Sequence, residues 1–218
     1  MKEAMLTIIF FVLLSSILVA AKDVFLRGKW IEVGIHNVAS YGTSTSTPIP
    51  AGFQAKSQAS RWNNGLGFIA DFAENGWTPS SGGFAGDYFL PGSPLEGWSV
   101  EYQTSPSGSE SVFIMKGRVG HNGMSPTSFE RTSPRWDPTK PHQLNTAVWI
   151  GTAGGKLKIS KTIQFLTDTK YFTTKVTMKN VSPNTLFDVE YMRNVDPDQG
   201  QPHGCGYSTR NYVKYNPL

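Results

Sequence analysis

Alternation of apolar and polar side chains in the last third of the chain limits the folds open to it more than any other feature. In residues 157–165 (LKISKTIQF), apolar side chains at 157, 159, 163 and 165 alternate with polar ones at 158, 160, 162 and 164. Residues 172–178 and 186–195 follow the same pattern. Successive side chains of a β-strand point to opposite faces of a sheet, so this period of two predicts strands with one buried face. We expect residues 144–195 to form an antiparallel meander.

Turn-forming residues divide the rest of the chain into short segments. The chain contains 22 glycines and 14 prolines, and short β-branched and aromatic segments lie between them, which is typical of a sandwich or a barrel. Further strands are predicted at residues 30–36, 66–71, 98–102, 111–116 and 144–151. We therefore predict an all-β fold, an antiparallel β-sandwich with long loops rich in Gly, Ser and Pro.

Three segments rich in Gly, Ser and Pro are predicted as the long loops: residues 40–58, 75–86 and 120–142. Loops longer than about 15 residues are uncommon in compact domains and are often binding loops. Neither an internal repeat nor a linker divides residues 22–218, so we expect one domain. The basic residues are scattered without a run of four, and the formal net charge is +4, which argues against nucleic acid as a partner.

The first 21 residues have the layout of a secretory signal peptide. Apolar and hydroxyl side chains fill residues 6–19 (LTIIFFVLLSSILV), and small residues then fit a cleavage site after Ala21. A membrane span needs about 20 apolar residues, so this run is short for an anchor and we expect residues 1–21 to be removed. The sequence therefore predicts a secreted or cell-surface protein, which contacts the membrane only if the signal stays uncleaved.

Two stretches stand out from the rest of the chain. Residues 86–98 read GDYFLPGSPLEGW, and residues 193–198 read RNVDPD. Together they resemble a group of exported, mostly microbial, β-rich proteins that carry GDYF-x-PG-x-P-x-EGW and R-x-V-DPD. This resemblance implies an exported β-rich domain and no particular activity. Members of the group continue beyond the point that corresponds to Leu218, so we expect the native chain to be longer.

The second stretch offers two carboxylates, Asp196 and Asp198, that are separated by one residue. Side chains at this spacing can turn toward one ion, and calcium prefers six to eight oxygen ligands. The alternative is an Asx-type turn, in which both carboxylates accept hydrogen bonds from nearby backbone N–H groups. We favour the turn and keep calcium as the candidate cofactor.

Arg193 lies on the presumed inner face of its strand, which is unusual for a charged residue. A buried guanidinium needs a partner because an isolated charge costs several kcal/mol. Asp196, Asp198, Asp87 and Glu96 are the natural candidates. We favour an ion pair that fastens a loop to the strand end. The alternative is a concave ligand site lined by Arg193, Asp87 and Glu96.

The six tryptophans and eight tyrosines are compatible with a carbohydrate ligand and equally with an aromatic core. Trp62, Trp77 and Trp136 lie in or beside predicted loops, where they can form platforms for sugar rings, whereas Trp30, Trp98 and Trp149 lie in predicted strands and are core candidates. No nucleophile elbow, HExxH helix or zinc knuckle is present in the sequence. The leading hypothesis is a non-catalytic exported β-sandwich in adhesion or glycan binding, with glycans or cell-surface polymers as partners. The alternatives are a carbohydrate-active enzyme and a structural envelope or matrix component.

Overall fold

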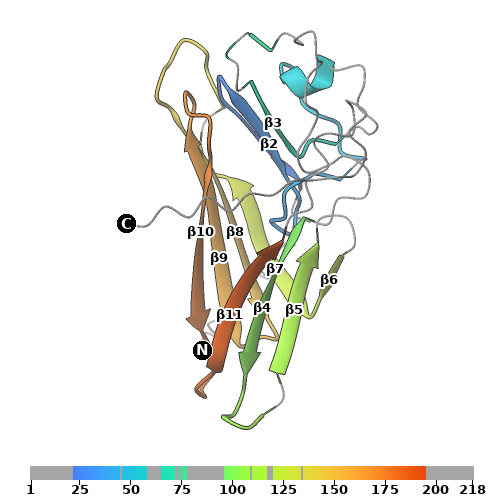
Figure 1. Ribbon diagram of the computed structural model, residues 1–218, viewed down its shortest axis with the longest axis vertical. Helices are drawn as coiled ribbons and strands as arrows, with labels where there is room; N and C mark the ends of the chain where they lie inside the picture. Colours follow the sequence, from blue (N-terminus) through green and yellow to red (C-terminus); the bar gives the residue numbers. More distant parts are fainter. Residues whose placement is uncertain are drawn as a thin grey trace, which may run out of the picture.

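The computed structural model describes residues 22–44, 46–57, 65–71, 74, 76–77, 96–108, 110–116, 120–133 and 135–194. Three antiparallel sheets and one short 3-10 turn, η1 (Gln54–Ser57), make up the regular structure of this part of the chain (Figure 1). The predicted all-β, sandwich-like antiparallel fold is confirmed.

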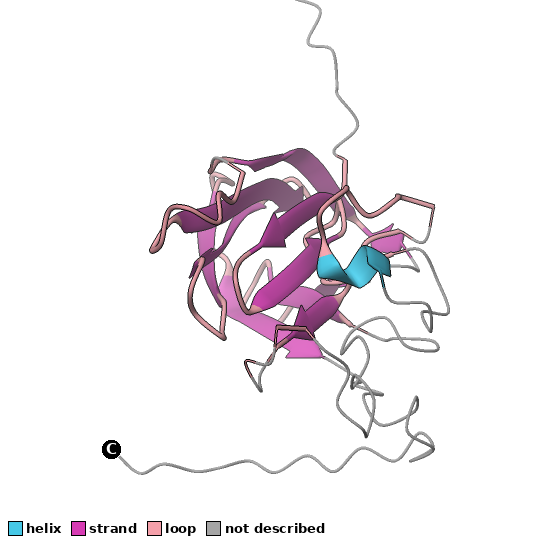
Figure 2. Cartoon of the chain, turned by 90° about the horizontal axis from the view of Figure 1, so that it is seen from above, coloured by secondary structure: helices cyan, strands magenta, loops and turns pink. Residues whose placement is uncertain are grey.

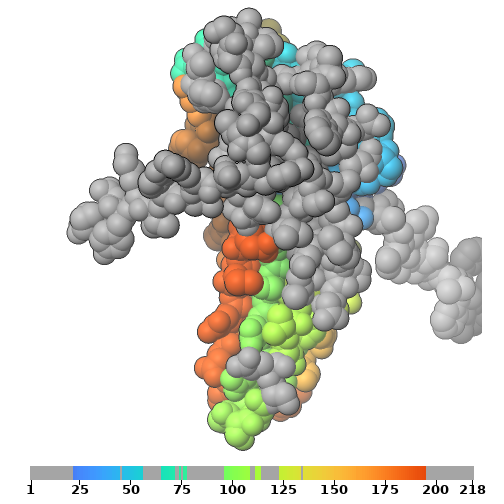
Figure 3. Space-filling model, turned by 45° about the vertical axis from the view of Figure 1, so that its right-hand side comes forward, coloured from blue at the N-terminus to red at the C-terminus, as the bar shows by residue number. Residues whose placement is uncertain are grey.

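Two four-stranded sheets form the body of the molecule. The first has the order β10 (Thr173–Asn180), β9 (Leu157–Leu166), β8 (Leu144–Ala153) and β7 (Met124–Arg131). The second has the order β11 (Phe187–Asn194), β4 (Gly97–Gln103), β5 (Glu110–Lys116) and β6 (Gly120–Asn122). The outer face of the second sheet is seen in Figure 3, where orange-red and green side chains of β11, β4 and β5 lie at the surface.

The two sheets meet in an apolar core because alternate side chains of their strands point inward. On β9 the side chains at 157, 159, 163 and 165 are buried, as their spacing predicts. Trp98 of β4 and Trp149 of β8 meet edge to face with ring centroids 5.2 Å apart. Tyr102 Oη of β4 donates to the carbonyl of Ala153 at the end of β8. Trp98 and Trp149 are therefore core residues, as predicted.

A third, smaller sheet lies at the upper end of the molecule in Figure 1. It consists of β1 (Val24–Arg27), β2 (Ile31–Ile35) and β3 (Phe68–Ala70). All five residues of β2 are buried, because one side of this strand joins the main core and the other faces a second apolar cluster of Ile49, Ala55, Leu66 and Ile69. Seen from above, the strands of the three sheets surround one interior (Figure 2).

Two predictions about connectivity are wrong. Residues 120–142 are not one long loop, because β6 and β7 both fall within them. The meander ends at β10: β11 crosses to the other sheet and pairs with β4 instead of continuing beside β10. A register shift in the β11–β4 pairing lies between Phe187 and Glu190, where Asp188 has φ +46°. The bulge leaves Val189, predicted to face inward, 36% exposed.

The hairpin between β8 and β9 turns at two glycines, as predicted. Gly154 and Gly155 have φ values of +55° and +68°, in the left-handed region that side chains with a Cβ rarely adopt. A Cβ at Gly154 would also lie 2.5 Å from Tyr102 Oη, whereas one at Gly155 would meet nothing within 4 Å. The first glycine is therefore needed for conformation and for space, and the second for conformation alone.

Candidate functional site

Residues 37–41 lie between the sheets after β2, and we call them the bridging segment. Three consecutive carbonyls of this segment accept hydrogen bonds from strand side chains: Asn37 O from Trp149 Nε1 at 3.1 Å, Val38 O from Trp98 Nε1 at 3.0 Å, and Ala39 O from Lys161 Nζ at 2.8 Å. A buried carbonyl without a partner is costly, so these side chains allow irregular backbone to enter the core. The bridging segment thereby connects β4, β8 and β9.

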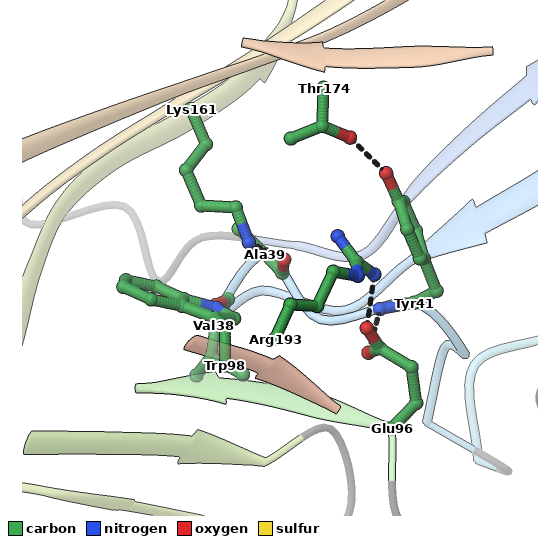
Figure 4. Close-up of polar contacts among 8 residues, drawn as sticks. All are labelled: Val38, Ala39, Tyr41, Glu96, Trp98, Lys161, Thr174 and Arg193. Carbon is green, nitrogen blue, oxygen red and sulfur yellow. Dashed lines mark hydrogen bonds and ion pairs between the residues drawn. The ribbon is translucent and has the colours of Figure 1, made fainter. Parts of the chain in front are cut away.

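The bridging segment also contacts Glu96 and Arg193, two of the predicted site residues (Figure 4). Arg193 of β11 forms an ion pair with Glu96, which immediately precedes β4, and its guanidinium carbon lies 4.0 Å from the centroid of the Tyr41 ring. The backbone N–H of Tyr41 donates to the same carboxylate, and the Tyr41 hydroxyl is hydrogen-bonded to Thr174 of β10. The inward position of Arg193 is thus confirmed, and Glu96 is its partner.

Burial changes the proton affinities of this cluster. Desolvation raises the pKa of Glu96, and the charges of Arg193 and Lys161 oppose that rise. Tyr191 of β11 also belongs to this cluster, because its ring centroid lies 5.9 Å from that of Trp98. Desolvation likewise raises the pKa of Tyr41, and it raises that of Tyr191 to about 12. Both phenols therefore stay protonated at neutral pH.

Lys161 is the least expected member of the cluster. It lies between Ile159 and Ile163 on the inner face of β9 and is completely buried, with its amine 4.3 Å from the centroid of the Trp98 ring. Desolvation, reinforced by the positive charge of Arg193, holds the pKa of Lys161 well below its usual value. The carboxylate of Glu96 opposes this lowering. Burial therefore shifts the balance toward the neutral amine, and either protonation state can donate to the bridging segment.

The geometry of the cluster favours a structural role. The Glu96 side chain is 1% exposed and is held by both Arg193 and the Tyr41 N–H. Asp71 is another buried acidic residue, and its carboxylate accepts from the backbone N–H groups of Gly76 and Trp77. An ion pair that fastens the start of β4 to β11 explains these contacts without a ligand.

The remaining predicted site residues lie apart from this cluster or outside the described residues. Trp77 is half-buried, packs on the second apolar cluster and donates from its indole N–H to the carbonyl of Lys29. Asp87, Asp196 and Asp198 lie outside the described residues, so the Asx-type turn at Asp196 and Asp198 and the alternative calcium site both remain predictions. Within the described part of the chain, no group of three or more His, Cys, Asp or Glu side chains is placed to hold a metal ion.

A cavity of about 300 Å³ opens between β1, residues 50–53 and the segment that follows β7. Its lining includes three arginines, three aromatic residues and one acidic residue: Arg27, Arg131, Arg135, Phe25, Phe53, Trp136 and Asp23. This volume is at the lower end of the range of about 300–1,000 Å³ for small-molecule sites. The cavity therefore suits one unit of a larger ligand, and we call it the arginine pocket.

Arg27 is fixed on one wall of the arginine pocket. Its guanidinium carbon lies 4.4 Å from the centroid of the Trp136 ring, and its Nε lies 3.2 Å from a carboxylate oxygen of Glu32. Glu32 is fully buried and also accepts hydrogen bonds from the backbone N–H groups of Gln54 and Ala55 at the start of η1. This carboxylate therefore links β2 to Arg27 and η1.

Arg131 and Arg135 come from the end of β7 and the segment that follows it. Arg131, the last residue of β7, donates to the carbonyl of Ser133 and to Asn145 Oδ1, both at 3.1 Å. Asn145 is buried and donates in turn to the backbone carbonyl of Arg27 at 2.9 Å, which joins β8 to β1. Arg135 is exposed and has no ion-pair or hydrogen-bond partner among the described residues.

Comparison of the chain with protein-family models, curated proteins and solved structures finds no match. Among the residues that the structure describes, no helix has the length and apolar character needed to cross a membrane. The site must therefore be interpreted from its own geometry.

Sequence analysis missed Lys161 and the three arginines. Lys161 carried a signal, because it occupies an inward position in a strand of period two. The arginines carried none: Arg27 and Arg131 are more than 100 positions apart, and the fold brings their segments together through the contact of β1 with β8. Trp136, which the sequence predicts as a platform for sugar rings, lines the arginine pocket.

Proposed function

We propose that this protein is an exported, non-catalytic β-sandwich that acts in adhesion or glycan binding, with the arginine pocket as its contact site. The observation that carries this proposal is the composition of the pocket: aromatic side chains form part of its walls, and guanidinium groups held by internal hydrogen bonds and ring contacts supply directed donors. Apolar and aromatic walls with a few fixed polar groups are the usual composition of a small-molecule site.

The number of acidic side chains in the described lining of the pocket favours binding over hydrolysis. Glycoside hydrolysis generally takes two carboxyl groups on either side of the scissile bond. Among the described lining residues only Asp23 is acidic, and its two oxygens accept backbone N–H groups from Asn37 at 3.1 Å and Ser44 at 2.7 Å. Asp23 therefore has the contacts of a structural residue.

A glycan array with two tryptophan variants tests the proposal. We expect wild-type protein to bind a subset of glycans, and Trp136→Ala to weaken that binding about 10-fold or more, as loss of a central aromatic contact does. Trp77→Ala is the matched control, because Trp77 was also predicted to bind sugar but packs on the second apolar cluster and is not among the residues that line the pocket. Thermal unfolding of both variants establishes that they are folded.

The results separate three explanations. Loss of binding in Trp136→Ala alone supports the arginine pocket. Loss of binding in Trp77→Ala alone places the glycan site at Trp77 instead of the arginine pocket. Absence of binding by folded wild-type protein to every glycan contradicts the proposed function.

A further inference from the structure

We propose that the arginine pocket selects an anionic saccharide unit, one that carries a carboxylate or a sulfate group, and that Arg135 is the residue that binds the anionic group. This inference rests on the proposed function and adds the chemical class of the ligand. The charged groups of the pocket carry this inference. Some of them have partners within the protein, and one has none among the described residues.

Two of the charges in the pocket have fixed partners. Arg27 forms an ion pair with buried Glu32, and the Asp23 carboxylate is occupied by two backbone N–H groups. Arg135, in contrast, presents an exposed guanidinium at the pocket with no partner among the described residues. The protein thus offers five N–H donors of one guanidinium to whatever enters.

The position of Arg131 strengthens this argument. Desolvation and the positive charge of Arg135 both lower the pKa of Arg131, so the two guanidinium groups are close enough to repel each other. Hydrogen bonds to Ser133 and Asn145 hold Arg131 in place despite that repulsion. An anion beside both groups would remove the repulsion, because each guanidinium gains an opposite charge. Two like charges converging on a cavity are therefore explained by an anionic ligand.

The rest of the lining favours a saccharide over a free inorganic anion. Phe53 and Trp136 give the pocket aromatic surface, and a simple anion would leave that surface without a partner. A planar guanidinium matches the geometry of a carboxylate through two parallel hydrogen bonds and also binds tetrahedral oxyanions. A sugar acid or a sulfated sugar satisfies both parts of the pocket at once.

The test uses oligosaccharides in matched pairs, with each uronic acid printed beside its methyl ester and each sulfated sugar beside its unsulfated parent. Poly-glutamate serves as a polyanion without a sugar ring. Binding of wild-type protein, Arg135→Gln and Lys175→Gln is measured at 50 and 150 mM salt. Lys175 is exposed on β10, outside the pocket lining, so its substitution removes the same charge elsewhere on the surface.

We expect wild-type protein to bind the charged member of a pair, and Arg135→Gln to weaken that binding roughly 10-fold. Binding of the neutral member should stay within twofold in this variant, and Lys175→Gln should bind like wild type. The pair that responds, uronic acid or sulfate, identifies the anionic group.

Several outcomes overturn the inference. Equal binding of charged and neutral members refutes anionic selection but leaves glycan binding intact. Equal losses in Arg135→Gln and Lys175→Gln indicate general surface charge, and equal binding of poly-glutamate refutes the requirement for a sugar. Failure of folded wild-type protein to bind any saccharide refutes the proposed function itself.

Discussion

Replacement of Lys161 by methionine is expected to remove a pH-dependent contribution to the free energy of unfolding. The amine is completely buried, donates to Ala39 O and lies near the positive charge of Arg193. Desolvation lowers the pKa of Lys161 in the folded protein, whereas the unfolded chain exposes the amine to water. Methionine keeps most of the side-chain volume and removes the proton-binding group.

The sign and size of the effect follow from proton linkage. Below the folded-state pKa of Lys161, both states are protonated and pH has no effect through this group. Between that pKa and about 10.5, only the unfolded state binds the proton, so rising pH favours the folded state by about 1.4 kcal/mol per pH unit. Above about 10.5 this gain is complete. The variant lacks this gain, and at every pH it also loses a hydrogen bond worth about 1–3 kcal/mol in a buried site.

Urea unfolding at pH 7, 8, 9 and 9.5 measures the effect. We expect the free energy of unfolding of wild type minus that of Lys161→Met to grow as the pH rises, by at most about 1.4 kcal/mol per pH unit, because the pKa of Lys161 is lowered in the folded protein. Taking the difference cancels the other titrating groups. Lys158→Met, at an exposed position three residues earlier on β9, is the control and should change stability by less than about 0.5 kcal/mol. A constant difference between wild type and Lys161→Met from pH 7 to 9.5 would refute the neutral amine.

Two further substitutions test the cluster and the hairpin. Arg193→Met should cost about 3 kcal/mol at pH 8, because the buried Glu96 carboxylate loses its cation, and less near pH 5, where that carboxylate can take up a proton. Urea unfolding at both pH values measures this, and a cost no larger than that of Lys175→Met would contradict it. Gly155→Ala should cost about 1 kcal/mol from backbone strain alone, and Gly154→Ala about 2–3 kcal/mol because its Cβ also overlaps neighbouring side chains. Equal melting temperatures of the two glycine variants would show that the overlap is relieved at no cost.

The strands that could be predicted from the sequence bury their side chains more regularly than those that could not. β9 buries every second residue without interruption, so its period of two is visible in the sequence. β7 has Pro126 within it and a register shift between Pro126 and Ser128, and Met124 and Phe129 are its buried residues. A bulge moves the pattern by one residue, so the two halves of such a strand cancel each other in any search for alternation.

Alternation predicts which way a side chain points but not what it meets. It placed Arg193 on the inner face of β11 and left four acids as its partner. The structure selects Glu96, a residue 97 positions earlier, because β11 crosses to the sheet that contains β4. Pairing between distant strands depends on the whole topology, and so do the sites that such pairing assembles. For this reason the sequence predicts that Arg193 forms an ion pair but not with which acid. It does not predict that the three arginines meet at one pocket.

The buried cluster and the arginine pocket are connected through Asp23. The Asp23 carboxylate accepts a hydrogen bond from the backbone N–H of Asn37, the first residue of the bridging segment. Asp23 itself lines the pocket beside β1. The carbonyl of Asn37 accepts from Trp149, so the pocket wall is tied to the core of the sandwich within two hydrogen bonds. A binding site gains affinity when its polar groups are held in place before the ligand arrives. The buried polar contacts around residues 37–41 therefore also act outside the core. They hold in place the backbone to which Asp23, in one wall of the pocket, is hydrogen-bonded.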